Sequence, residues 1–115
     1  GFGVRKDPIQ HDKRFHSGID IACPIGTRVN SARNGRVIFS GYSGGYGKLV
    51  IVKHSRNYCT YYGHLNKILV KKDDTVSTGQ KIAISGNTGR TTGPHLHFEV
   101  RKYEKPIDPG LLLNR

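Results

Sequence analysis

The sequence predicts a small all-β domain of mainly antiparallel strands, folded as a sheet or sandwich with a groove. Short runs rich in β-branched and aromatic residues recur along the 115 residues, and clusters of Gly, Asn, Asp and Ser separate them. No segment places apolar residues at i, i+3, i+4 and i+7 over several turns, so no long amphipathic helix is expected. The 15 glycines indicate tight connections between the strands.

The expected strands follow from local composition and from the turn residues that bound them. The first is short and ends at Pro24 and Gly26, and the last alternates apolar and polar residues. Residues 65–70 are also compatible with one helical turn. The glycine-rich loops 40–47 and 85–93 are expected to be hairpin connections or the walls of a groove. The strands are expected at residues 19–22, 35–40, 48–53, 59–64, 68–70, 81–84 and 95–101.

Composition limits the classes of protein and partner. A chain of 115 residues without repeats or interior linkers indicates a single domain over residues 1–115. The formal net charge of +11 favours an anionic partner such as nucleic acid, lipid or an acidic envelope polymer. The basic residues are dispersed and no nucleic-acid-binding motif is present, so nucleic acid is disfavoured. No apolar run approaches the roughly 20 residues that span a bilayer.

The ends of the chain and its cysteines leave several questions open. The sequence opens Gly-Phe-Gly without Met or a leader, which is typical of an excised or processed domain with flanking or inhibitory segments in the full-length protein. Cys23 and Cys59 are not a CxxC pair. One disulfide between them and two separate thiols are both compatible with the sequence.

A His-x-His pair lies on the last expected strand. Residues two apart on a strand point to the same face, so His95 and His97 are expected side by side, with Glu99 further along that face. Such a pair can present two imidazoles to one metal, although an isolated His-x-His is more often a pair of surface histidines. Glu99 could orient a ligand histidine, or it could pair with Arg101.

A second pattern, His16-Ser-Gly-Ile-Asp20, leads from a turn into a strand. Imidazole and carboxylate together suit Zn²⁺, and a catalytic zinc site usually keeps three protein ligands and one open position for water. Two histidines and one aspartate from these patterns satisfy that count. The HExxH, GxSxG, phosphate-loop and dinucleotide-binding patterns are all absent.

The run GNTGRTTGPHLHFEV at residues 86–100 resembles the signature of the LytM/lysostaphin-type zinc metallopeptidases. His16-Ser-Gly-Ile-Asp20 is similar to the first metal motif of that family. Four further blocks match in the same order, and the similarity runs from residue 1 to about residue 109. These blocks are GRVI at residues 35–38, GYG at residues 45–47, YGHL at residues 62–65 and VSTGQ at residues 76–80.

The resemblance implies a LytM-like (duplicated-hybrid-motif) domain and assigns the roles that spacing left open. His16, Asp20 and His97 are the implied ligands of one Zn²⁺ with a bound water, and His64 and His95 are the implied catalytic pair. We favour His95 as the base, because it stands beside the ligand His97. His54 is interpreted as a turn or packing histidine.

The implied function is that of a zinc metallo-endopeptidase that hydrolyses peptide bonds in bacterial peptidoglycan, for cell-wall remodelling or lysis. Stem-peptide cross-links are favoured over glycine bridges as its substrate. The implied location is extracytoplasmic, in the periplasm or at the cell surface, and the positive charge suits adhesion to anionic envelope polymers. A catalytically silent wall-binding or regulatory domain of the same fold is the alternative, which the retained ligands disfavour. A nucleic-acid-binding β domain is a third reading, based on charge alone.

Overall fold

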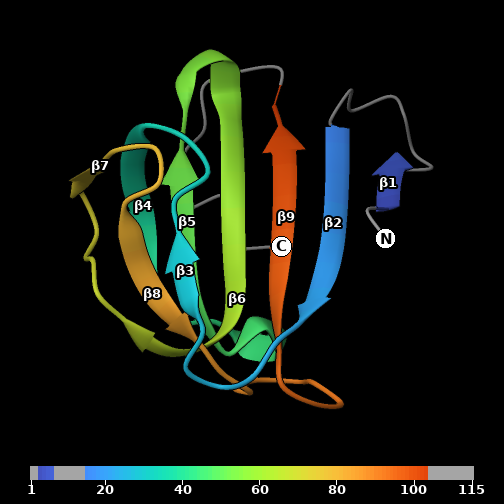
Figure 1. Ribbon diagram of the computed structural model, residues 1–115. Coiled ribbons are helices and arrows are strands. Elements are labelled where there is room, and N and C mark those ends of the chain that lie inside the picture. Colours follow the sequence, from blue (N-terminus) through green and yellow to red (C-terminus); the bar gives the residue numbers. More distant parts are fainter. Residues whose placement is uncertain (1–2, 7–14, 104–115) are drawn as a thin grey trace.

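The computed structural model describes residues 3–6 and 15–103, with side chains described from residue 18 onward, and within these ranges it consists almost entirely of antiparallel strands (Figure 1). Two short 3₁₀ turns, η2 (Gly44–Tyr46) and η3 (Ser55–Asn57), flank β5. The strands are β1 (Gly3–Lys6), β2 (Phe15–Ala22), β3 (Arg28–Asn30), β4 (Gly35–Tyr42), β5 (Lys48–Lys53), β6 (Tyr58–Ile68), β7 (Thr75–Val76), β8 (Lys81–Ser85) and β9 (His95–Lys102).

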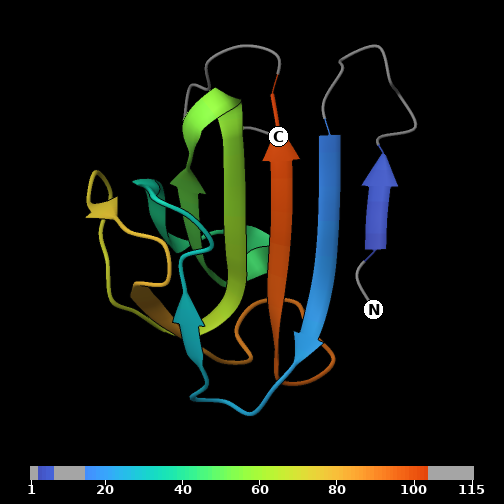
Figure 2. The ribbon, with the colours of Figure 1, turned by 45° about the horizontal axis from the view of Figure 1, so that its top comes forward.

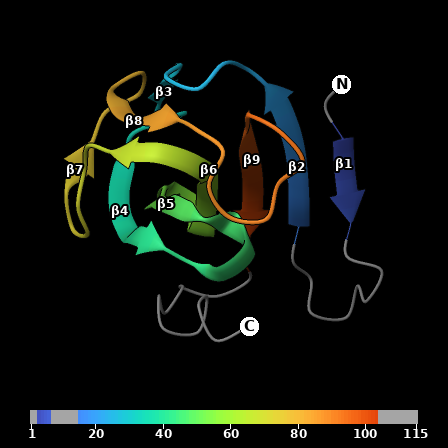
Figure 3. The same cartoon turned by 90° about the horizontal axis from the view of Figure 1, so that it is seen from below.

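The strands form one strongly curved sheet with the order β1-β2-β9-β6-β5-β4-β7, while β8 pairs with both β6 and β3. Seen from below, β4 to β8 curl around one another, whereas β9, β2 and β1 extend beside them (Figure 3). The tilted view shows β9, β2 and β1 side by side as a flatter arm (Figure 2). The fold thus joins a closed, barrel-like half to an open half, and β9 lies at the junction.

The strand β6 connects the two halves because it has a different partner at each end. Its first part pairs with β9 as far as Gly63, which lies opposite His97, and its last part pairs with β8 from Leu65 to Ile68. His64, between the two parts, has a φ of 59°. A positive φ is uncommon for a residue with a side chain, and here it interrupts the alternation of the strand at the point where the partner changes.

The apolar side chains form two clusters, because both faces of the central strands are covered. Strand β5 (Lys-Leu-Val-Ile-Val-Lys) contributes to both, since Val50 and Val52 belong to the first cluster and Leu49 and Ile51 to the second. A continuous apolar run is the pattern expected for a strand buried on both sides. The first cluster consists of Val29, Val37, Val50, Val52, Tyr62, Leu65, Val76, Ile82 and Ala83, and the second of Ile38, Leu49, Ile51, Cys59 and Tyr61.

The all-β expectation is confirmed, and each expected strand falls on or within an observed strand except residues 68–70, where only Ile68 is in a strand. The alternative of a helical turn at residues 65–70 is wrong, because Leu65 to Ile68 continue β6 and pair with β8. Within the described residues, no helix is long and apolar enough to cross a membrane.

Both cysteines are free thiols. Cys59 lies opposite Arg101, near the end of β9, whereas Cys23 follows Ala22, which lies opposite His95 at the start of β9. The two are therefore held at opposite ends of one strand. Burial raises the pKa of the Cys59 thiol to about 12.

A directed chain of hydrogen bonds links the buried His54 to the first core cluster. Its Nδ1–H donates to the carbonyl of Asn34 at 2.7 Å, because a carbonyl can only accept. Its Nε2 therefore accepts from the Thr60 hydroxyl at 2.7 Å. The Thr60 oxygen lies 2.7 Å from the Tyr62 hydroxyl, which in turn accepts from the backbone N–H of Ala32 at 3.0 Å. This arrangement confirms the interpretation of His54 as a packing residue and specifies its neutral form.

Replacement of His54 by glutamine is expected to remove part of the acid sensitivity of the fold. Burial lowers the pKa of His54 in the folded protein. In the unfolded chain a histidine has a pKa of about 6.5, so below that pH the unfolded chain binds more protons than the native one. Stability is therefore complete above that value and falls as the pH drops below it. Between pH 8 and pH 5 in urea unfolding, the wild type should lose more stability than His54→Gln, because only the wild type must keep this buried ring neutral as the pH falls. Equal losses in the two proteins would contradict this account.

Candidate active site

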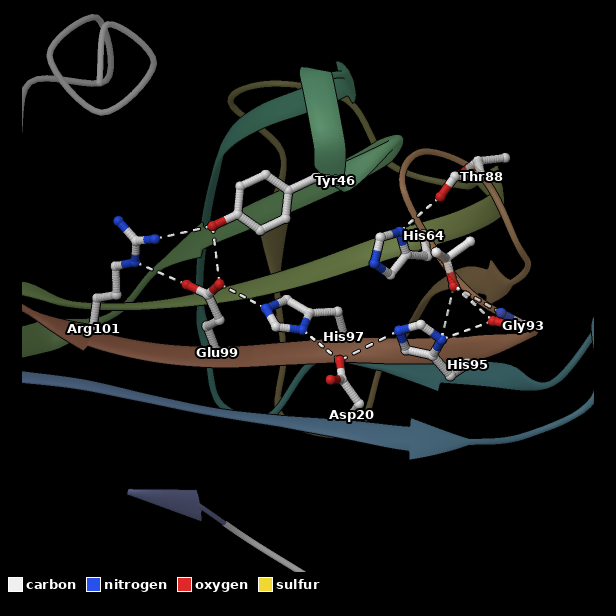
Figure 4. Close-up of polar contacts among 10 residues, drawn as sticks. Asp20, Tyr46, His64, Thr88, Gly93, His95, His97, Glu99 and Arg101 are labelled. Carbon is white, nitrogen blue, oxygen red and sulfur yellow. Dashed lines mark hydrogen bonds and ion pairs between the residues drawn. The ribbon is translucent and has the colours of Figure 1, made fainter. Parts of the chain in front are cut away.

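The His-x-His strand presents its polar residues on one face, as the alternation predicts. In β9, His95, His97 and Glu99 lie on the same face, and their neighbours in β2 are Ala22, Asp20 and Gly18 respectively. Asp20 is thus directly opposite His97. Figure 4 shows the imidazoles of His95 and His97 on either side of the Asp20 carboxylate, with the His64 imidazole beside them from β6.

The Asp20 carboxylate is the centre of this cluster. Its Oδ1 lies 2.6 Å from Nδ1 of His97 and 3.3 Å from Nε2 of His95. The His64 ring is 4.7 Å from the His95 ring and 6.0 Å from the His97 ring, measured between centroids. One carboxylate and three imidazoles therefore converge, and the Asp20 side chain is 63% exposed, so the cluster is open to solvent.

The two histidines of the predicted catalytic pair are held in the same way. Nδ1 of His64 donates to the carbonyl of Thr88 at 2.7 Å, and Nδ1 of His95 donates to the carbonyl of Gly93 at 2.8 Å. Both acceptors belong to the glycine-rich loop that precedes β9. With its proton on Nδ1, each neutral ring carries the lone pair on Nε2, which is the form required of a base.

Gly63 leaves the space that Tyr46 and His97 occupy against β6. A Cβ at this position would lie 3.2 Å from Cδ1 of Tyr46 and 3.6 Å from Cβ of His97. The next residue, His64, has the positive φ described above, and its imidazole lies on the site face beside His95. Simple alternation along β6 would not have placed both Gly63 and His64 toward the site. The backbone conformation of the Tyr-Gly-His block therefore places His64 at the site, and the alternation of side chains along a strand does not predict this.

The electrostatics keep the carboxylate ionised and one imidazole neutral. The hydrogen bond from His97 lowers the pKa of Asp20 below its usual range, against a smaller opposing effect of burial. Burial lowers the pKa of His64, which favours the neutral ring at neutral pH. Hydrogen bonding to Glu99 raises the pKa of His97, with Asp20 adding to the effect.

A buried network lies behind His97, on the side away from Asp20 (Figure 4). Nε2 of His97 is 2.6 Å from Oε1 of Glu99, and Tyr46 donates its hydroxyl to the same oxygen at 2.9 Å. Arg101 donates Nε to the other carboxylate oxygen at 2.9 Å and Nη2 to the Tyr46 hydroxyl at 2.9 Å. The sequence left two interpretations of Glu99 open, contact with His97 or pairing with Arg101. The structure shows both contacts at once.

Two glycine-rich loops meet over the cluster and form one wall of a hollow of about 270 Å³. Gly47 and Gly89 touch backbone to backbone, since a Cβ on Gly89 would lie 2.3 Å from the nitrogen of Gly47. Both have positive φ, of 67° and 80°, so glycine is required for conformation as well as for space. The hollow is lined by Gly45, Tyr46, His64, Arg90 and His97. The expectation that these loops wall a groove agrees with this arrangement.

His16, the remaining predicted ligand, lies in β2 opposite Arg101 and four residues before Asp20, but its side chain is outside the described part. Although Asp20 and the three histidines lie close together, no three His, Cys, Asp or Glu side chains between residues 18 and 103 are arranged so that they could hold a metal ion. The donor chemistry nevertheless fits zinc. An ionised carboxylate and the Nδ1 of an imidazole face each other at an open surface, and nitrogen and oxygen donors of this kind are those that Zn²⁺ takes.

A carboxylate among imidazoles, beside a solvent-open hollow, is an arrangement compatible with a metal-dependent hydrolase. The comparison with protein families agrees, because the model of peptidase family M23 matches residues 14–109. The chain belongs to this family. The predicted resemblance to LytM/lysostaphin-type peptidases is thereby confirmed.

Individual relatives are enzymes of the bacterial cell wall by name. The chain is 48% identical over 107 residues to the peptidoglycan DD-endopeptidase ShyB of Vibrio cholerae, which covers 90% of this chain and 24% of that protein. It is 43% identical over 108 residues to the DD-carboxypeptidase/endopeptidase Mpg of Neisseria meningitidis, which covers 94% of this chain and 25% of that protein. The chain thus spans about a quarter of the length of these curated relatives.

Solved structures share the fold. A zinc-containing peptidase from Vibrio cholerae superposes with a TM-score of 0.71 at 42% identity, over 95% of this chain and 34% of that one. The catalytic domain of lysostaphin from Staphylococcus simulans superposes with a TM-score of 0.75 at 33% identity, over 100% of this chain and 91% of that one. The LytM-like fold predicted from the sequence is therefore confirmed.

Proposed function

We propose that this domain is a zinc-dependent endopeptidase that cuts peptide bonds in bacterial peptidoglycan. The observation that carries the proposal is the close approach of the Asp20 carboxylate and the imidazoles of His64, His95 and His97, beside an open hollow that His64 and His97 line. Membership of peptidase family M23 and the names of the relatives support a cell-wall substrate.

In this proposal Asp20 and His97 hold the zinc, and His16 is the third ligand. Bound zinc supplies Lewis-acid chemistry, polarising the scissile carbonyl and acidifying a water molecule to a pKa of about 7. His95 takes the proton of the attacking water at its Nε2, which lies on the Asp20 side of the ring. His64 presents its own Nε2 to the developing oxyanion or to the leaving amine. The hydrogen bonds to Thr88 and Gly93 keep both rings in these orientations.

A catalytically silent regulatory domain is disfavoured, because the sequence retains the proposed ligands and both proposed catalytic histidines. A nucleic-acid-binding domain draws support from net charge alone, whereas Asp20, Glu99 and Arg101 at the site pair with other residues of the site. The proposed location is the extracytoplasmic envelope, where peptidoglycan is accessible, and adhesion to anionic envelope polymers is the role proposed for the positive surface.

Digestion of purified peptidoglycan, followed by mass spectrometry of the released fragments, tests the proposal. We expect loss of cross-linked peptides with the domain, no loss in the presence of a chelator, and recovery after zinc is added back. Cleavage that is indifferent to chelator would overturn the metal mechanism. Bound zinc without cleavage would favour the regulatory domain.

We further propose that stem-peptide bonds are preferred over glycine bridges, and Arg90 is the reason. Arg90 lies at the wall of the hollow with His64 and His97, and its side chain makes no ion pair with any acidic side chain of residues 18–103. In a peptide cut by a carboxypeptidase, and in a cross-link to the D-centre of diaminopimelate, the leaving residue carries a free carboxylate next to the scissile amide. A guanidinium binds such a group well, whereas a glycine bridge offers only amides there.

Replacement of Arg90 by glutamine should therefore reduce a substrate preference. The test compares an acylated D-Ala-D-Ala peptide with the same peptide as its carboxamide. The wild type should favour the free acid, and Arg90→Gln should lower kcat/KM for the acid by about 10- to 100-fold, the worth of one hydrogen bond to a charged group, while sparing the amide. The control is Arg28→Gln, which removes the same charge from β3, outside the hollow. Equal losses on both peptides would contradict the role in carboxylate binding.

A further inference from the structure

We propose that Glu99 is a positioning residue, which fixes the tautomer and the orientation of His97 so that Nδ1 is the nitrogen presented to the metal. The inference rests on the proposed function in one respect, that His97 is a metal ligand. It adds a residue outside the predicted ligand and catalytic sets, together with the two side chains that hold it, Tyr46 and Arg101.

The two nitrogens of His97 have different surroundings. Nε2 is 2.6 Å from Oε1 of Glu99, whose side chain is 6% exposed, whereas Nδ1 faces the Asp20 carboxylate, whose side chain is 63% exposed. A carboxylate only accepts, so without a metal both nitrogens donate, Nε2 to Glu99 and Nδ1 to Asp20, and a metal ion would take the place of the Nδ1 proton. Only the Nδ1 side of the ring is open to an ion from solvent.

Glu99 is itself held at both carboxylate oxygens. Arg101 binds Oε2 through Nε, the Tyr46 hydroxyl binds Oε1, and Arg101 binds the Tyr46 oxygen, each at 2.9 Å. The guanidinium carbon of Arg101 lies 4.5 Å from the centre of the Tyr61 ring, which covers the network. These contacts fix the orientation of the Glu99 carboxylate, and the carboxylate in turn fixes the orientation of the His97 imidazole.

Tyr46 also connects this network to the substrate hollow. It ends η2, its ring centroid is 5.8 Å from that of His97, and it lines the hollow with Arg90. Its side chain is thus both a wall of the site and a support for the group behind the ligand. Carboxylates that orient metal-binding imidazoles in this way commonly contribute about 10- to 100-fold in metal affinity.

The test uses Glu99→Leu, which removes the acceptor, Glu99→Gln, which keeps an amide oxygen as acceptor, and Tyr46→Phe, which removes one donor to Glu99. Tyr58→Phe is the matched control, since Tyr58 lies at the start of β6 outside this network. Zinc affinity is measured by competition with a chromophoric chelator. The protonated nitrogen of His97 is identified by ¹⁵N NMR in zinc-free and zinc-loaded protein.

We expect zinc affinity to fall by about 10- to 100-fold in Glu99→Leu, with a smaller loss in Glu99→Gln and a loss of a few-fold in Tyr46→Phe. In the wild type the single ring proton should be on Nε2, both in the zinc-loaded protein and in zinc-free protein at a pH where the ring is neutral. In Glu99→Leu it should be distributed over both nitrogens. Unchanged affinity and an unchanged Nε2 proton in Glu99→Leu would overturn the proposal. If that variant does not fold, wild-type values in both Glu99→Gln and Tyr46→Phe would overturn it instead.

The outcomes separate this inference from the proposed function. A wild-type domain that binds no zinc contradicts the proposed function, while the zinc-free NMR spectra still decide whether Glu99 fixes the tautomer. If the wild type binds zinc and cleaves peptidoglycan, the proposed function is supported. If Glu99→Leu then has unaltered zinc affinity and an unaltered His97 tautomer, the proposed role of Glu99 is excluded.

Discussion

Replacement of Asp20 by alanine should abolish zinc binding and, with it, peptidoglycan cleavage. Asp20 is the carboxylate on which His95 and His97 converge, so its loss removes the anionic donor and leaves imidazoles alone. The loss of zinc affinity should exceed the roughly 10- to 100-fold typical of residues that only orient a ligand. His97→Ala and His16→Ala should behave in the same way. Metal content after dialysis and fragment release from peptidoglycan measure the two effects.

The control for Asp20→Ala is Asp73→Asn, a change of one exposed carboxylate in the turn before β7, which should leave zinc content and cleavage unchanged. A further comparison with Asp20→Asn separates charge from size, and we expect it to resemble the alanine variant. Full zinc occupancy in any one of the three ligand variants would remove that residue from the proposed ligand set.

Alanine at His95 or His64 should leave zinc bound and remove most of the turnover. Neither residue is assigned as a ligand, and each imidazole is tied through Nδ1 to the loop 86–93, so its part in the proposal is proton transfer or oxyanion binding. General acid–base groups typically contribute about 10²- to 10⁴-fold in rate, and a loss of that size in kcat is expected. The measurement is kcat on a defined cross-linked peptide at equal zinc occupancy.

His54→Gln serves as the control for these variants, because it removes a buried histidine that lies between β5 and η3, outside the site, and is bonded to Thr60 of β6. Its kcat should equal that of the wild type at neutral pH. A His64 or His95 variant with wild-type kcat would exclude that residue from catalysis, and one that lost zinc would move it to the ligand set.

The sequence was sufficient for the fold class and for the arrangement along β9, because both follow from short-range rules. Alternation along a strand placed His95, His97 and Glu99 on one face, and the register with β2 then brought Asp20 opposite His97. The pairing itself was not predictable, since register between strands distant in sequence depends on the whole sheet. The ligand set came from resemblance to a family, and for His16, Asp20 and His97 alike it stays a prediction.

Other parts of the site could not be predicted from the spacing of residues along the strands, for physical reasons. His64 depends on a positive φ within a strand, which a pattern of side chains does not indicate. The continuation of β6 through residues 65–68 was missed because the strand exchanges β9 for β8 as its partner. The hydrogen bond of Tyr46 to Glu99 was not predictable from spacing, because it joins segments 53 positions apart. Only the adjacent glycines, which permit the close loop contact, pointed to that segment.

The state of the two thiols has a consequence for handling the domain and for where it can fold. Because Cys23 and Cys59 are free and held at opposite ends of β9, the native fold needs no oxidant and no disulfide exchange. The same chain can reach its fold in a reducing cytoplasm or in an oxidising envelope. Cys59 is 0% exposed, so its reaction with a thiol reagent marks the moment at which the β5–β6–β9 sheet opens. The rate at which Cys59 is labelled therefore measures how often this part of the sheet unfolds.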